Sequence, residues 1–146
     1  MLRGIVLTRE GHMMEKAHDT LRDLHRGTPL WFTTSGWLVP AGVLAQFLLA
    51  GQALYGNTGF GVHAVLGTLL VLPVLALLLG PLLVSRLRGF GWWAGILAVL
   101  MLVQFVLAAG NAKPFLAYHP ANGALVLATS LVLLVKIERR RVHAAR

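Results

Sequence analysis

The sequence predicts an all-α integral membrane protein, a four-helix bundle in up-down-up-down order with an N-terminal amphipathic helix at the membrane interface. Its 146 residues are 57% hydrophobic and only 12% charged, whereas a typical soluble domain is about 25% charged. The mean hydropathy is +0.73. Charged residues are absent from long stretches, including all of 27–85. An uncharged apolar stretch of roughly 18 residues already indicates a membrane helix.

The first 30 residues are predicted to form a cytoplasmic domain (1–30) outside the bundle. Apolar residues recur there at helical spacing, with acids and bases on the remaining surface. These apolar residues are Met13, Met14, Ala17, Leu21 and Leu24. We therefore expect an amphipathic helix from Thr8 to about Arg26, lying at the cytoplasmic interface. Docking on a partner subunit is the alternative.

Four apolar segments follow, and together they form the predicted transmembrane domain (31–136). They are 31–55, 60–84, 90–110 and 114–135. Helices of these lengths measure roughly 31–38 Å, enough to cross a ~30 Å hydrocarbon core with some tilt. The short connections predict antiparallel neighbours. Prolines should bend the first, second and fourth segments, and a basic cytoplasmic tail (137–146) ends the chain.

The basic residues indicate the orientation. Of the 13 Lys and Arg residues, all but Lys113 lie in the N-terminal segment, the connection between the second and third spans, or the C-terminal end. The positive-inside rule then makes both termini cytoplasmic. Abundant Ala, Gly, Leu and Arg favour a bacterial inner membrane. Positive-inside bias and anionic membrane lipid account for the net charge of +8, so nucleic-acid binding is not expected.

The chain contains two tandem copies of a two-helix unit. Each copy has the pattern Q-F-x-L-A followed by a small residue, beginning at Gln46 and at Gln104. A short loop follows, and then the pattern H-x-x-x-G. This second pattern joins His63 to Gly67 and His119 to Gly123. Two units of equal topology are expected to pack around a pseudo-twofold axis along the membrane normal.

This repeat predicts a cofactor site between His63 and His119. Both histidines would lie at one depth near the non-cytoplasmic surface, on diagonal helices with axes roughly 13 Å apart. That separation is too large for two imidazoles to share one small ion, but it suits a flat group between them. We therefore expect one haem b with two axial histidines. The glycine one turn deeper would let the ring approach the backbone.

Other roles for these residues stay open. Gln46 and Gln104 would lie deeper than the histidines and would hydrogen-bond each other, a histidine-bearing helix or a haem edge; a purely interhelical role is the alternative. The histidines themselves could be interfacial polar residues inherited together by duplication. However, ionisable residues inside spans are rare and functional by default. The absence of cysteine excludes disulfides, thiolate metal sites and covalently attached haem.

The arrangement resembles one half of haem A synthase, in which four-helix modules place histidines near the outer ends of their second and fourth helices. It is similar more broadly to small membrane b-type cytochromes. The resemblance covers about residues 31–136 and implies a haem-binding scaffold. That enzyme's catalytic half has a carboxylate one turn before a histidine, where this chain has Phe60 and Leu116. The outer cysteine pair of many members is also missing, which argues against the enzyme's oxidation chemistry.

The leading functional prediction is therefore a non-catalytic cytochrome that transfers electrons near the non-cytoplasmic face. Two axial histidines leave no open position on the iron, which favours electron transfer over oxygen chemistry. A quinone or a redox protein at the outer face, or a larger complex, would be its partner. Two alternatives remain: a haem-handling or assembly protein, and a non-haem accessory membrane subunit. No set of catalytic residues for hydrolysis occurs in the spans.

Overall fold

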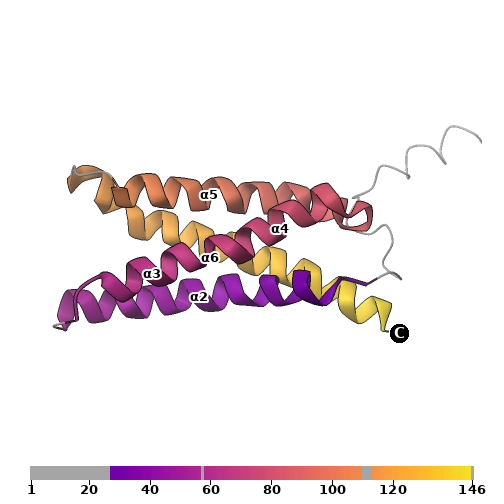
Figure 1. Ribbon diagram of the computed structural model, residues 1–146, viewed down its shortest axis with the longest axis horizontal. Helices are drawn as coiled ribbons and strands as arrows, with labels where there is room; N and C mark the ends of the chain where they lie inside the picture. Colours follow the sequence, from indigo (N-terminus) through magenta and orange to yellow (C-terminus); the bar gives the residue numbers. More distant parts are fainter. Residues whose placement is uncertain (1–26, 57, 110–112, 146) are drawn as a thin grey trace, which may run out of the picture.

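The computed structural model describes residues 27–56, 58–109 and 113–145, and this part of the chain is almost wholly helical. The predicted amphipathic helix of residues 8–26 lies outside it. Four helical segments of the described part are long and apolar enough to cross a membrane, which confirms the all-α class. Figure 1 shows them side by side along one long axis.

The first and last helices are continuous, and the second and third segments are each divided. Helix α2 covers Leu30–Tyr55 and α6 covers Lys113–Ala144. The second segment consists of α3, Gly61–Leu69, and α4, Val71–Leu83. The third begins with a 3-10 helix, η3, Ser85–Phe90, and continues as α5, Gly91–Ala109. The end of α2, the start of α3, the end of α5 and the start of α6 lie at the left end of Figure 1. The end of α4 and the start of α5 lie at the right end.

A proline explains the break between α3 and α4. Pro73 has no N–H group, so the carbonyl of Leu69 lacks its usual partner four residues later. Helical bonding resumes on both sides, because Leu70 N donates to Leu66 O and Val74 N donates to Leu70 O. Other prolines, such as Pro40 and Pro120, lie inside helices without ending them.

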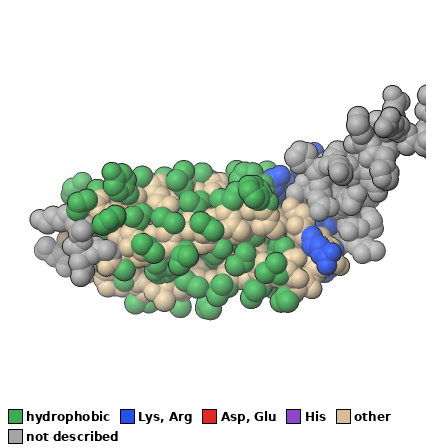
Figure 2. Space-filling view, turned by 90° about the horizontal axis from the view of Figure 1, so that it is seen from above, with side chains coloured by type: hydrophobic (Ala, Val, Ile, Leu, Met, Phe, Trp, Pro, Cys, Tyr) green, Lys and Arg blue, Asp and Glu red, His purple; other side chains and the backbone are tan. Residues whose placement is uncertain are grey.

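The C-terminal end differs from the expected separate tail. Helix α6 continues to Ala144, so most of the basic segment 137–146 extends the fourth helix rather than following it. Half-buried Glu138 joins this extension to α2, since Trp37 Nε1 donates to Glu138 Oε1 over 2.9 Å. Arg141 pairs with the same carboxylate at 2.7 Å. In Figure 2 the blue basic side chains gather at this end, which we call the arginine end.

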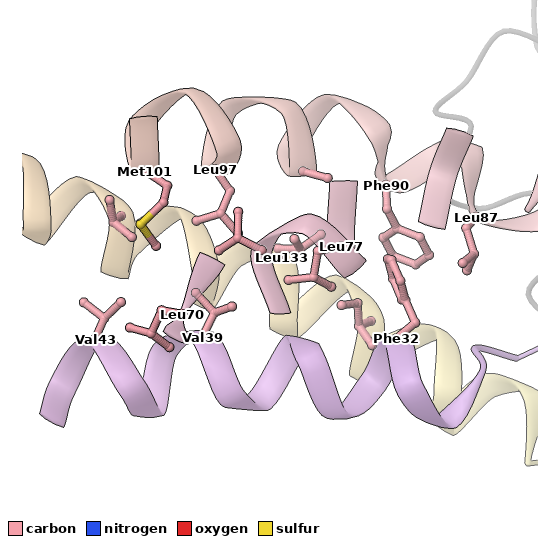
Figure 3. Close-up of a cluster of buried hydrophobic side chains, with 14 residues drawn as sticks. Phe32, Val39, Val43, Leu70, Leu77, Leu87, Phe90, Leu97, Met101 and Leu133 are labelled. Carbon is pink, nitrogen blue, oxygen red and sulfur yellow. The ribbon is translucent and has the colours of Figure 1, made fainter. Parts of the chain in front are cut away.

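A cluster of buried hydrophobic side chains lies between the helices, and Figure 3 shows it from Phe32 and Leu87 to Val43 and Met101. At the arginine end, Phe32 and Phe90 are fully buried with ring centres 5.4 Å apart. The guanidinium of buried Arg140 lies 5.3 Å from the Phe90 ring centre. The core extends inward to Val43 on α2 and Met101 on α5, and no residue beyond these on either helix is buried.

The opposite end, which we call the histidine end, is built differently. Helix α3 contributes no buried residue to the core. Here the side chains of Gln46 and Gln104 lie against Gly67 and Gly123. Along the whole bundle the outer surface carries many exposed Leu, Val and Phe side chains (Figure 2). Such a surface indicates contact with membrane lipid.

Close packing at the arginine end predicts a glycine requirement at position 80. A Cβ atom on Gly80 would lie 2.7 Å from Cε2 of Phe32, which Phe90 prevents from moving away. We expect Gly80→Ala to lower the free energy of unfolding in detergent by about 1–3 kcal/mol, the usual cost of overpacking. The matched control is Gly95→Ala, since nothing lies within 4 Å of that position. Equal stability of the two variants would contradict this packing.

Candidate functional site

The structure brings His63 and His119 together. His63 is the third residue of α3, and His119 lies in the first turns of α6. Their ring centres are 6.1 Å apart with an angle of 57° between the planes. The rings are therefore much closer than the diagonal helix axes led us to expect, and the argument that they could not share a small ion was wrong. Both side chains are half-buried, and their rings lie next to each other.

Gln46 on α2 fixes the position of His63 from two directions. Its side-chain Nε2 donates to the His63 carbonyl oxygen at 2.8 Å. In return, His63 Nδ1 lies 3.1 Å from the Gln46 carbonyl oxygen. A carbonyl oxygen can only accept, so His63 Nδ1 carries the hydrogen, and the neutral ring has its lone pair on Nε2. The ring of Phe60 packs edge-on against it at 5.9 Å.

Gln104 on α5 makes the matching contact with His119. Its Nε2 donates to the His119 carbonyl oxygen at 3.1 Å, as Gln46 does to His63. The same Nε2 lies 3.0 Å from His119 Nε2. Both predicted glutamines thus bridge their helices to a histidine-bearing helix. Their contact with a haem edge stays a prediction.

Asn122, one turn after His119, determines the direction of these hydrogen bonds. Its Nδ2 donates to the Leu100 carbonyl oxygen at 2.9 Å, and this fixes the amide orientation. The same Nδ2 donates to Gln104 Oε1 at 2.6 Å, so Gln104 Nε2 is the donor toward His119. His119 Nε2 must accept, and the neutral ring carries its hydrogen on Nδ1. Both histidines therefore have the same tautomer.

Gly67 and Gly123 make room for the two glutamine amides. A Cβ atom at position 67 would lie 3.1 Å from Gln46 Nε2. One at position 123 would lie 3.4 Å from Gln104 Nε2 and equally close to Phe47. In this structure the glutamine side chains occupy the space beside the two glycines. The sequence predicted that a haem ring would approach the backbone there. The assignment of both glycines to a haem pocket stays a prediction.

Two buried polar atoms at this end have no hydrogen-bond partner among the described residues. They are Gln46 Oε1, an acceptor, and His119 Nδ1, which carries a hydrogen in the tautomer above. Leaving such an atom unpaired costs about 1–3 kcal/mol. Two unpaired atoms of opposite type in one side-chain cluster indicate that the cluster is incomplete without a ligand or solvent.

Two histidine nitrogens suit a metal that is already coordinated by a non-protein ligand. No group of three or more His, Cys, Asp or Glu residues that could hold a metal ion occurs in the described ranges, and a structural zinc site needs about four protein ligands. Metal–nitrogen bonds of about 2.0–2.1 Å on both sides of one metal place two imidazole ring centres about 6 Å apart. The observed ring separation of 6.1 Å is close to that value, whereas the Nε2 atom of His119 lies 3.0 Å from Gln104 Nε2.

Sequence reasoning missed the role of Asn122. Its signal was present, because a buried asparagine within an apolar span needs a partner inside the protein. The position three residues after the histidine is Leu66 in the first unit and Asn122 in the second. The repeat was defined by the residues that the two units share, so this difference between Leu66 and Asn122 was not considered.

Comparison with known proteins gives one match. Residues 46–112 are similar to a family described as "Family of unknown function (DUF6220)". The match begins at Gln46, includes His63 and Gln104, and ends before His119. No curated protein and no solved structure matches the chain.

The packing of Gln46 on Gly67 can be tested by stability. We expect Gly67→Ala to push the Gln46 amide away from the His63 carbonyl and to lose a hydrogen bond worth about 0.5–1.5 kcal/mol. Gly51→Ala is the matched control on α2, because nothing lies within 4 Å of a Cβ atom there. Thermal unfolding in detergent measures the difference. A Gly67→Ala protein as stable as the control would show that the contact contributes nothing.

Proposed function

We propose that this protein is a membrane b-type cytochrome that holds one haem b between His63 and His119. One observation carries the proposal: the ring centres of His63 and His119 lie 6.1 Å apart, and the hydrogen bonds of both rings fit a hydrogen on Nδ1. That tautomer offers Nε2, a nitrogen suited to bind iron. Haem contributes its own four nitrogens and supplies one-electron chemistry when bound, so two protein ligands are enough.

The surroundings of His63 support this assignment. Metal-binding histidines usually donate their other ring N–H to a carbonyl or carboxylate, which fixes the ring and strengthens the ligand. His63 Nδ1 donates to the Gln46 carbonyl oxygen in this way, and no described residue hydrogen-bonds its Nε2. The lack of buried hydrophobic side chains on α3 is consistent with a macrocycle completing this end of the bundle.

We further propose that the helices cross a bacterial inner membrane in up-down-up-down order, as two tandem repeats with both termini cytoplasmic. The basic side chains at the arginine end support this orientation. The site then lies near the non-cytoplasmic face. With two axial histidines, electron transfer to a quinone, a redox protein or a partner subunit is the role that fits. The likeness to half of haem A synthase is part of the same proposal.

One observation favours a second candidate, a haem-handling protein. Gln104 Nε2 donates to the His119 nitrogen that would bind iron. A ligand that has another partner when iron is absent is suited to accepting and releasing haem. Rapid transfer of haem to an acceptor protein would favour this candidate. Reversible reduction without haem loss would favour electron transfer.

The visible spectrum of the purified protein tests haem binding. We expect a reduced low-spin b-type spectrum in the wild type, which His63→Ala and His119→Ala each abolish or convert to high spin. His143→Ala is the matched control, because that exposed histidine lies on α6 at the arginine end and contacts Arg139 O. It should keep the wild-type spectrum.

A wild type that stays colourless after haem addition would contradict both haem candidates. The non-haem accessory subunit would then be the remaining interpretation, with the glutamine–histidine contacts serving only to join the helices.

A further inference from the structure

The two histidines differ in what occupies the nitrogen that would bind iron. No described residue hydrogen-bonds His63 Nε2, while Gln104 Nε2 donates to His119 Nε2 at 3.0 Å. The first unit has no counterpart to this contact, because Gln46 reaches the His63 carbonyl and not its ring. The site is therefore asymmetric although the two units share the same pattern.

Asn122 maintains this difference between the two histidines by orienting the Gln104 amide. It donates to the Leu100 carbonyl oxygen at 2.9 Å and to Gln104 Oε1 at 2.6 Å. These contacts keep the Gln104 amide oriented with its N–H groups toward His119. Leu66, at the equivalent position of the first unit, cannot do this for Gln46, and Gln46 Oε1 is unpaired among the described residues.

A hydrogen bond to a ring nitrogen and a bond from that nitrogen to iron exclude each other, because both use the same lone pair. Binding of iron to His119 must therefore break the contact with Gln104, whereas binding to His63 breaks no described hydrogen bond. Gln104 thus opposes only one of the two ligands.

We propose that His119 is the exchangeable ligand and that Gln104, positioned by Asn122, competes with the iron for its Nε2 atom. His63 then holds the haem permanently, and the sixth position opens to a small neutral ligand such as carbon monoxide. This inference rests on the proposed function and adds a ligand-binding site to it. Gln104 and Asn122 act as positioning residues.

Carbon monoxide titration of the ferrous, haem-loaded protein tests the proposal. Gln104→Leu removes the competitor, so His119 binds iron more firmly and the affinity for carbon monoxide falls about three- to tenfold, as expected for one hydrogen bond. Asn122→Leu should shift the affinity in the same direction by less. Gln52→Leu on α2 is exposed, removes the same type of side chain and should leave the affinity unchanged.

An unchanged or higher affinity in Gln104→Leu would overturn the inference and leave the bis-histidine cytochrome standing. Absence of haem from the wild type would overturn both. If only the Gln104→Leu protein fails to retain haem, Gln104 is not a competitor, and the inference is wrong.

A second measurement needs no haem. Nitrogen-15 NMR of the haem-free protein should show His119 protonated on Nδ1 and unprotonated on Nε2. In Gln104→Leu the signals should move toward the opposite tautomer, since the donor to Nε2 is gone. His63 should keep its Nδ1–H tautomer in both proteins, because its partner is the Gln46 carbonyl oxygen. A His119 ring that carries its hydrogen on Nε2 in the wild type would contradict the competition.

Discussion

Two glutamine amides that donate to histidine carbonyl oxygens determine how the histidine end is built. Inside an apolar span, a polar side chain has no water and must find its partner within the protein. Gln46 and Gln104 each find it on the neighbouring histidine-bearing helix. The requirement for a glycine beside each amide follows from this contact.

The bundle is divided along its length into a packed half and a half that holds the histidines. The core from Phe90 to Met101 consists of interlocking hydrophobic side chains, whereas α3 buries none. The break caused by Pro73 lies near this boundary and separates the short helix that carries His63 from the packed helix α4. The hydrophobic core and the glutamine–histidine contacts thus lie in different parts of the chain.

Much of this arrangement was predictable from the sequence. The length of the apolar segments and their lack of charge predicted the four helices, and the duplicated pattern singled out glutamines and histidines that the structure brings together. The distance between the rings was not predictable, because the separation of the helix axes does not determine the direction of a side chain. The direction of the hydrogen bonds also required the structure, since it depends on the contact between Asn122 and the Leu100 carbonyl oxygen. The end of α6 was missed because charged residues continue a helix as readily as they end a span.

The central claim is that iron binds between His63 and His119. The most direct test is the electron paramagnetic resonance spectrum of the oxidised wild-type protein, recorded together with its iron content. We expect about one haem iron per chain and a low-spin signal of the type given by two axial imidazoles. Iron that is entirely high-spin, or a purified protein without haem iron, would contradict it.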